Sequence, residues 1–283
     1  MKFKNFNLDH WLENWLAEDM GSGDLTTDLI VPEATVAKAC IHSKDIGLLA
    51  GVDIAERVFT LLNPDIQFTM YARDGAQLDK QTVIATVEGD TRSILTGERL
   101  ALNLLQHLSG IATKTAQFTA LTAPYGTRLV DTRKTTPGLR LLEKYAVRVG
   151  GGFNHRLGLY DAVLIKDNHI KVAGGIKAAL ELVKQKISHM TKIEIEVEDI
   201  AGVEAALRGG ADVIMLDNMD CDQMIQAVKL IGGRVPVEAS GGITAKTVAA
   251  IAATGVDIIS VGALTHSGRS LDISLDIDLK KNR

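Results

Sequence analysis

Polar residues or glycines follow each of six short apolar segments in the second half of the chain. The last four of these segments start roughly 20 residues apart. The residues at their carboxyl ends are Asp131-Thr132-Arg133-Lys134, Lys166, Glu196, Asp217, Glu238-Ala239-Ser240-Gly241-Gly242 and Gly262. Charged, hydroxyl and glycine residues at the same end of every strand are typical of a ligand or active site in an α/β barrel. The set predicts one shared site.

The charge distribution indicates what kind of ligand this site takes. Residues 131–171 contain eight Lys and Arg against four Asp and Glu, a net charge of +4 in a chain whose net charge is −4. A solvated basic helix from Arg140 to Arg148 would account for three of the cations. It does not account for the four that flank strands: Arg133, Lys134, Arg156 and Lys166. A cationic pocket in an acidic protein predicts a small anionic ligand rather than a polyanion surface.

Acidic residues alternate with apolar ones in the segment Ile193-Glu-Ile-Glu-Val-Glu198. A strand period of two puts its three glutamates on one face, and if the apolar face meets the helices, the acids point into the barrel. Asp217 would then lie beside Glu196 at the end of the next strand. Buried carboxylates need cations. Magnesium suits two carboxylates near substrate phosphates; salt bridges to Lys134 and Lys166 are the alternative, and both can hold.

A phosphate cradle is predicted at Ser240-Gly241-Gly242, before a helix opened by Thr244. Glycines let backbone N–H groups approach oxygen, and a helix N-terminus favours negative charge. Gly262-Ala263 follows the last strand, so the two segments occupy the place where barrels commonly bind phosphate.

The elements that must position these residues are parallel βα units. Apolar runs and helical patterns alternate along this half of the chain, which favours an α/β barrel. Six obvious strands are fewer than the usual eight, and a doubly wound open sheet is the alternative. The strands are expected at 128–131, 161–165, 193–197, 212–216, 235–238 and 256–261, and the helices between them at 176–186, 202–208, 223–231 and 245–254.

The first 108 residues have a different pattern, that of a mixed α/β region. Strands are expected at 37–42, 66–71 and 83–87, and a helix at 97–109 with Gly110 as its C-cap. An amphipathic helix near the N-terminus carries an apolar stripe that is expected to dock on the protein itself or on a partner subunit. The stripe consists of Leu8, Trp11, Leu12, Trp15 and Leu16.

Composition excludes several classes of protein. The chain has 283 residues, of which 46% are apolar and 23% charged, values ordinary for one large or two modest globular domains. Two distant cysteines, Cys40 and Cys221, fit free thiols in a reducing compartment. No signal peptide or membrane span is expected, since the first segment carries acids throughout and no apolar run is long enough. We expect a soluble, cytoplasmic protein that binds neither nucleic acid nor membrane.

The central segment 131–170, DTRKTTPGLRLLEKYAVRVGGGFNHRLGLYDAVLIKDNHI, resembles the signature region of the quinolinate phosphoribosyltransferase family. The resemblance continues in order through LTGERLALNLLQHLSGIAT, KIEIEVE, DVIMLDN, VEASGGI and ISVGALTHS, and so covers nearly the whole chain. It implies an N-terminal α/β sandwich domain (1–108), an incomplete α/β barrel of fewer than eight strands (109–268) and a C-terminal segment (269–283) that packs back on the N-terminal domain. It also implies a homodimer or a dimer of dimers with shared active sites.

The resemblance further implies a reaction and its residues. Quinolinate and phosphoribosyl diphosphate would give nicotinate mononucleotide, diphosphate and CO2 on the route to NAD, with Mg²⁺ as cofactor. Arg133, His155, Arg156 and Lys166 would surround the substrate carboxylates, joined by Arg99 of the other subunit. Lys134 would face the diphosphate donor, and Glu196 and Asp217 its ribose and magnesium. The ribose 5-phosphate would be held by Ser240, Gly241, Gly242, Gly262 and Ala263, with His266 close by.

Two alternative functions are compatible with such a barrel. One is the molybdenum-associated paralogue of this family, which we expect to lack the Lys-Asp-Asn-His run at 166–169. The other is a non-catalytic anion-binding barrel, but a pure carboxylate binder needs no acids such as Glu196 and Asp217 beside its ligand. Nicotinate, with one carboxylate, would not call for so many cations.

Overall fold

The computed structural model describes residues 8–278, which form two compact units. The first unit comprises residues 8–113 and 268–278, and the second residues 114–267. The first division falls inside a long helix, five residues after the expected domain end at 108. Residues 1–7 and 279–283, at the outer ends of the expected N-terminal domain and C-terminal segment, lie outside the described residues.

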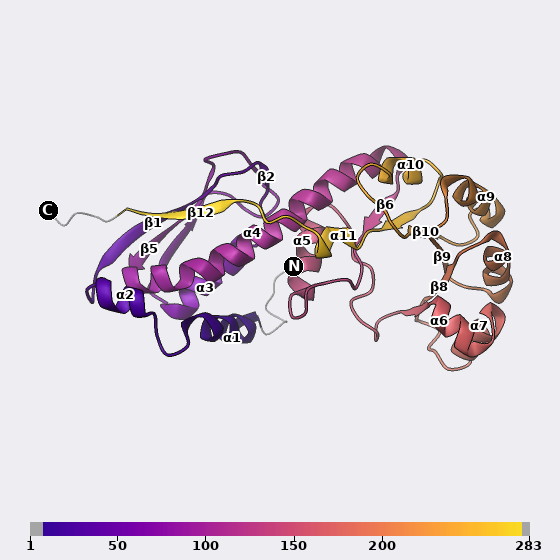
Figure 1. The fold of residues 1–283 in the computed structure, drawn as a ribbon, viewed down its shortest axis with the longest axis horizontal. Coiled ribbons are helices and arrows are strands. Elements are labelled where there is room, and N and C mark those ends of the chain that lie inside the picture. Colours follow the sequence, from indigo (N-terminus) through magenta and orange to yellow (C-terminus); the bar gives the residue numbers. More distant parts are fainter. Residues whose placement is uncertain (1–7, 279–283) are drawn as a thin grey trace. The chain divides into compact units, whose positions relative to one another are not determined.

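The first unit is built on a four-stranded antiparallel sheet in the order β12-β1-β5-β3 (Figure 1). Because β12 pairs with β1, the chain after the second unit returns to complete this sheet. The four strands are β1 (Val36–Ser43), β3 (Gln67–Met70), β5 (Val83–Asp90) and β12 (Ile273–Asp278), and a small pair is formed by β2 (Gly47–Leu48) and β4 (Gln77–Leu78). The helices are α1 (Leu8–Met20), α2 (Leu25–Ile30), α3 (Val52–Leu62) and α4 (Thr91–Thr122).

The expected amphipathic helix is present as α1. Leu12 and Leu16 of its apolar stripe are buried, and the helix packs on α3 within the same unit. The ion pair between Asp9 of α1 and Arg57 of α3, with 2.8 Å between Oδ1 and Nε, accompanies this packing. The stripe therefore docks on the protein's own body.

The prediction that a helix ends at Gly110 was wrong. Helix α4 continues without a break from Thr91 to Thr122, and Gly110 lies buried in its middle. A Cβ at this position would lie 2.1 Å from the carbonyl oxygen of Arg269. Gly110 is therefore required by the close approach of the returning chain and not by the end of a helix.

The second unit is a six-stranded parallel sheet in the order β6-β11-β10-β9-β8-β7. Apart from β6, which neighbours the last strand, sequential strands lie side by side, as in an incomplete barrel; this confirms the expected fold class over the doubly wound alternative. Figure 1 shows α7, α8 and α9 outside the strands. The strands are β6 (Arg128–Val130), β7 (Val163–Ile165), β8 (Ile193–Val197), β9 (Val213–Asp217), β10 (Val237–Ser240) and β11 (Ile258–Ser260).

Local sequence signals explain where the helices of this unit begin. Asp199 caps α8 by accepting a hydrogen bond from Gly202 N at 2.7 Å, and Asp220 forms a capping box with Gln223 at the start of α9. The expected helix at 245–254 begins only at Val248, after a turn. The unit also contains η2 (Ala123–Tyr125), α5 (Arg140–Val149), α6 (Asp167–Ala173), α7 (Ile176–Lys184), α8 (Ile200–Gly209), α9 (Cys221–Ile231), α10 (Val248–Ala252) and α11 (Ala263–His266).

Candidate active site

The carboxyl ends of the barrel strands surround a cavity of about 530 Å³ in the second unit. It is lined by Thr132, Arg133, Lys134, His155, Arg156, Leu164, Lys166, Glu196, Met215, Asp217, Asn218, Glu238, Ser240, Gly241, Gly242 and Ser260. Every candidate residue between Arg133 and Gly242 is therefore brought to one cavity. Arg99 lies on the part of α4 that belongs to the first unit.

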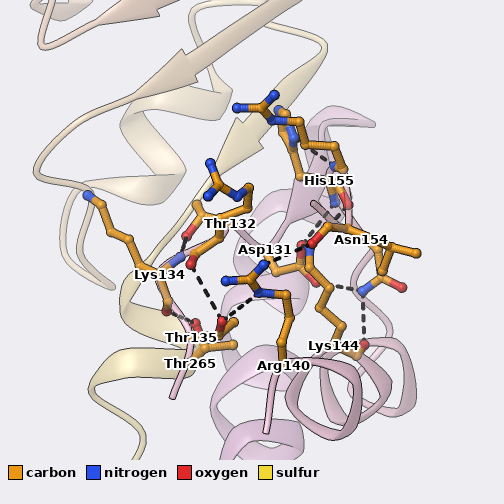
Figure 2. A network of polar contacts seen from close by, with 12 residues as sticks. Asp131, Thr132, Lys134, Thr135, Arg140, Lys144, Asn154, His155 and Thr265 are labelled. Carbon is orange, nitrogen blue, oxygen red and sulfur yellow. Dashed lines mark hydrogen bonds and ion pairs between the residues drawn. The ribbon is translucent and has the colours of Figure 1, made fainter. Parts of the chain in front are cut away.

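A buried ion pair anchors the loop that carries two of these residues. Asp131, at the end of β6, is bonded to the ammonium of Lys144, and both side chains are buried (Figure 2). Asp131 also accepts hydrogen bonds from Asn154 Nδ2 at 2.5 Å and from the backbone N–H of His155 at 2.9 Å. The interpretation of residues 140–148 as a solvated basic helix was thus wrong for Lys144, which points inward and neutralises Asp131.

The aromatic ring of Phe153 fixes the same loop from the other side. The guanidinium groups of Arg128 and Arg148 lie 5.5 and 5.0 Å from its centroid, within cation–π range. Backbone hydrogen bonds join Phe153 N to Leu129 O at 2.8 Å and Asp131 N to Phe153 O at 3.2 Å. The loop 152–156 therefore extends the edge of the sheet at β6 and presents His155 and Arg156 to the cavity.

Three cations, Arg133, Arg156 and Lys166, line the cavity in which an anion site is expected. Arg156 donates from Nη1 to Ala162 O at 3.0 Å, and burial, followed by the charge of Arg133, lowers the pKa of Arg156. Lys166, at the end of β7, lies with Nζ 2.6 Å from Glu196 Oε1. Among residues 8–278, the Nε of Arg133 is one of the buried polar atoms with no hydrogen-bond partner. Cations held in place with unused donors suit a ligand with more than one carboxylate.

Two of the three alternating glutamates face the interior. Glu196 lines the cavity and Glu194 is buried, whereas Glu198, beyond the end of β8, is exposed, so the expectation that all three point inward was wrong for the last one. Asp217 ends β9 and accepts a hydrogen bond from Asn218 Nδ2 at 2.9 Å. Glu196 and Asp217 thus stand on neighbouring strands with carboxylates open to the same cavity.

The two glycines after β10 are required for different reasons. Gly241 has a φ of +97°, and a Cβ there would lie 2.1 Å from Asn218 Oδ1, so the close approach of Asn218 requires a glycine. Gly242 also has a positive φ, and no atom lies within 4 Å of where its Cβ would be. The backbone at Gly242, which lines the cavity, is therefore open, as a phosphate cradle requires.

The segment after β11 contacts the loop that carries Lys134. Thr265 donates its hydroxyl to Lys134 O at 2.7 Å, and a Cβ on Gly262 would lie 2.9 Å from Lys134 Cδ (Figure 2). Lys114 of α4 donates from Nζ to Ala263 O at 2.6 Å and to Ser267 O at 3.1 Å. Gly262, Ala263 and His266 are thus held beside Lys134, although they are not among the residues that line the cavity.

Two buried glutamates, Glu194 and Glu238, lie behind His155; the sequence placed Glu238 at a strand end and Glu194 on the inward face of its strand but assigned neither a substrate or metal role. His155 Nε2 lies 3.0 Å from Glu194 Oε2 and 3.6 Å from Glu238 Oε2. Burial, followed by the charge of Glu194, raises the pKa of Glu238 to about 8. Burial alone would lower the pKa of His155, but the hydrogen bond to Glu194 and the two carboxylates raise it overall. The alternating pattern in β8 predicted that Glu194 faces the interior. Nothing in the sequence distinguishes Glu238 from an acidic residue at a strand end that contacts the ligand.

The fold and the cavity together define an α/β-barrel enzyme site for a small anionic substrate with carboxylate and phosphate groups. Two family models match the chain: quinolinate phosphoribosyl transferase, N-terminal domain, over residues 24–109, and its C-terminal domain over residues 111–276. The chain belongs to the quinolinate phosphoribosyltransferase family.

Curated relatives match over nearly their full length. The chain is 47% identical to a probable nicotinate-nucleotide pyrophosphorylase [carboxylating] of Synechocystis sp., covering 95% of this chain and 92% of the relative. It is 46% identical to the protein of the same name from Bacillus subtilis, covering 97% and 95%. Among solved structures, NadC from Streptococcus pyogenes is 42% identical, with a TM-score of 0.94 over 98% of this chain and 99% of that one.

Proposed function

We propose that this chain transfers the phosphoribosyl group of phosphoribosyl diphosphate to quinolinate with decarboxylation, giving nicotinate mononucleotide, diphosphate and CO2 in NAD biosynthesis. The observation that carries the proposal is one cavity that combines fixed cations, two open carboxylates and a glycine cradle. Family membership and the names of the curated relatives support the same reaction.

The cations would bind and orient quinolinate. Guanidinium forks hold two adjacent carboxylates in a fixed orientation, which aims the ring nitrogen at the ribose carbon. Arg133 and Arg156 supply these forks and Lys166 a further charge. In addition, the family resemblance assigns Arg99 of the partner subunit to a substrate carboxylate, in a homodimer with shared sites.

The carboxylates and Lys134 would act on the donor. Cleavage of the bond from the ribose carbon to diphosphate develops positive charge on the sugar and negative charge on the leaving group. Glu196 and Asp217 would stabilise the first, and Lys134 the second. Gly241 and Gly242, with Ser240 and the loop of Gly262, Ala263 and His266, would hold the ribose 5-phosphate.

The donor set of the cavity fits magnesium that arrives with the diphosphate. Magnesium prefers one or two carboxylates plus phosphate oxygens and water. Asp217 and Glu196 both line the cavity and are the residues that would hold the ion. Glu196 also lies 2.6 Å from the ammonium of Lys166 through its Oε1. When bound, magnesium would neutralise charge on the leaving diphosphate.

Decarboxylation needs no dedicated base in this scheme. After transfer, the ring nitrogen is cationic and stabilises the electron pair that stays on the neighbouring ring carbon when its carboxylate leaves as CO2. A proton from solvent then bonds to that carbon and completes nicotinate mononucleotide. The residues described here only have to hold the ring in place during this step.

The cellular location proposed is the cytoplasm. Among the helices of residues 8–278, none combines the length and apolarity that a bilayer crossing requires. The two described thiols, Cys40 and Cys221, are free, which fits a reducing compartment.

The direct test is turnover of quinolinate with phosphoribosyl diphosphate and Mg²⁺, with nicotinate mononucleotide and CO2 as products. Nicotinate and nicotinamide should be used at least about 100-fold less efficiently, because an unfilled cationic subsite leaves charges unpaired. Comparable turnover of nicotinate would contradict the substrate assignment. Binding of quinolinate without turnover would favour an anion-binding barrel, and failure to bind it would favour the molybdenum-associated branch of the family.

A further inference from the structure

Both ring nitrogens of His155 are already bonded within the protein. Nδ1 accepts a hydrogen bond from the backbone N–H of Arg156 at 2.8 Å. Nε2 lies 3.0 Å from Glu194 Oε2. A backbone N–H always carries its hydrogen, so Nδ1 must offer a lone pair, and the ring proton then sits on Nε2 and is donated to Glu194. The side chain of His155 is only 15% exposed, so water does not compete for these bonds.

From this geometry we infer that Glu194 and Glu238 are positioning residues. They fix His155 as the tautomer protonated on Nε2, and His155 in turn fixes the backbone of Arg156 and aims its guanidinium at the substrate. His155 then touches substrate through its ring and donates no hydrogen bond to it. This inference deepens the proposed function, on which its kinetic test rests.

The two glutamates have different parts in this arrangement. Glu194 of β8 is the nearer acceptor, and Glu238 of β10, two strands away in the same sheet, approaches the same nitrogen at 3.6 Å. Among residues 8–278, Glu194 Oε1 and Glu238 Oε1 are buried without a hydrogen-bond partner. Burial, followed by the charge of Glu194, raises the pKa of Glu238, so Glu238 keeps its proton more readily than an exposed glutamate does. Glu194, whose Oε2 lies 3.0 Å from Nε2, is the acceptor for the ring N–H.

The two carboxylates raise the pKa of His155, and it is the geometry at Nδ1 that opposes a second ring proton. The carboxylates that raise the pKa of His155 face Nε2, the atom that already bears the proton. Protonation of Nδ1 would place its hydrogen against the N–H of Arg156 and break that bond. The charge of Lys144 also opposes it.

The arrangement explains how Arg156 is held. Its guanidinium is tethered at Nη1 to Ala162 O at 3.0 Å, and its backbone N–H is tethered to His155. The peptide N–H of His155 is bonded to Asp131. The segment His155-Arg156 is thus held by two buried carboxylates: Asp131 bonds the backbone of His155, and Glu194 bonds its ring. Loss of Glu194 would free the His155 ring and, through it, loosen the guanidinium of Arg156.

The first test is a nitrogen NMR spectrum of the protein labelled with ¹⁵N-histidine, with the His155 signals assigned by their loss in His155→Gln. We expect a protonated Nε2 and an unprotonated Nδ1 at neutral pH. Two protonated ring nitrogens, or a proton on Nδ1, would overturn the inference. This measurement needs no turnover, so it stands even if the proposed reaction fails.

The second test is kinetic. Glu194→Ala should raise the KM for quinolinate about tenfold or more and leave the KM for phosphoribosyl diphosphate within about twofold, as loss of one oriented hydrogen bond predicts. Glu194→Gln, whose amide oxygen still accepts from Nε2, should recover most of this loss. The exposed Glu198→Ala is the matched control on the same segment and should change neither constant.

Three outcomes would contradict the positioning role. These are equal effects of Glu194→Ala and Glu194→Gln, a parallel rise in both Michaelis constants, and normal kinetics of Glu194→Ala. A further outcome concerns metal, because ligand atoms of His155, Glu194 and Glu238 lie within 4.8 Å of one another. Loss of the Nε2 proton on addition of Zn²⁺ to the labelled protein would make the trio a metal site and overturn the inference.

Discussion

Asp131 organises the residues around it because it is a buried carboxylate that accepts from three donors. Lys144 Nζ, Asn154 Nδ2 and the backbone N–H of His155 all converge on its two oxygens, and Asn154 and His155 O link back to Lys144. Removing one partner of a buried ion pair leaves an uncompensated charge, which costs far more than the pair itself stabilises. These bonds anchor the loop that carries His155 and Arg156, two of the candidate substrate-binding residues.

At the two carboxylates that we propose to face the ribose, loss of one negative charge should slow the reaction. Asp217→Asn or Glu196→Gln should each lower kcat by about 10- to 1000-fold, as expected for the loss of one electrostatic stabiliser. Activity should disappear with a chelator and return with Mg²⁺. Glu198→Gln, on the exposed side beyond β8, should behave as the wild type. Full activity of both active-site variants in chelator would remove the metal and these carboxylates from the mechanism.

The raised pKa of Glu238 predicts how stability depends on pH. Burial first, and the charge of Glu194 second, raise this pKa from 4.5 to about 8. Between these values the folded protein keeps a proton that the unfolded chain releases, so this contribution to the free energy of unfolding falls as pH rises. It is fully present below pH 4.5 and lost through about pH 8.

Thermal melts between pH 5 and 9 measure this effect. The melting temperature of the wild type should fall more steeply with rising pH than that of Glu238→Gln, whose amide does not titrate. The exposed variant Glu198→Gln should keep the wild-type slope. Identical slopes for the wild type and Glu238→Gln would mean that Glu238 is ionised in the folded protein.

At the scale of elements, the sequence predicted the strands better than the contacts between elements. All six barrel strands were expected within a few residues, because each is a short apolar run that ends in polar residues, and such runs are local features. The end of α4 and the burial of Lys144 were missed for the opposite reason. Gly110 is required by the carbonyl of Arg269, and Lys144 is turned inward by Asp131, and neither partner is near in sequence or marked by a local pattern.

The same limit applies to the candidate site. Residues that follow strands, such as Lys166 and Asp217, could be found because parallel strands end at one edge. Glu194 and Glu238 could not be separated from substrate-facing acids, since their role depends on where the ring of His155 lies. The loop at Phe153 was also missed as part of the sheet, because a single parallel bridge to Val130 has no sequence signal.

The close approach at Gly110 can be tested by whether replacing this glycine with alanine stabilises or destabilises the protein. Alanine for glycine inside a helix normally stabilises by about 0.5–1 kcal/mol. Gly110→Ala should instead destabilise the protein by about 1–3 kcal/mol, because its Cβ meets a backbone carbonyl that cannot move aside. Urea unfolding of the first unit would measure this, with the exposed Asn103→Ala on the same helix as control. A gain in stability for Gly110→Ala would show that the returning chain does not hold this position.

At the scale of the whole molecule, the two units contribute different candidate site residues. The cavity and its carboxylates all belong to the second unit, yet Arg99 belongs to the first. The family resemblance assigns Arg99 to the active site of a partner subunit. If that is so, the barrel of one chain depends on the N-terminal unit of another, and the smallest active species is a dimer.

Mixing two inactive variants tests whether Arg99 acts on the partner's site. Arg99→Ala should weaken quinolinate binding with little effect on phosphoribosyl diphosphate, because its guanidinium would contact only one substrate. Lys134→Ala should inactivate the barrel's own site, because Lys134 is proposed to act on the donor. A mixed dimer then has one site with both lesions and one with neither, so free subunit exchange should restore about a quarter of wild-type activity. Each variant exchanged with itself is the control. If the mixture stays as inactive as its parents although exchange is demonstrated by mass, Arg99 acts within its own chain and the shared-site dimer is wrong.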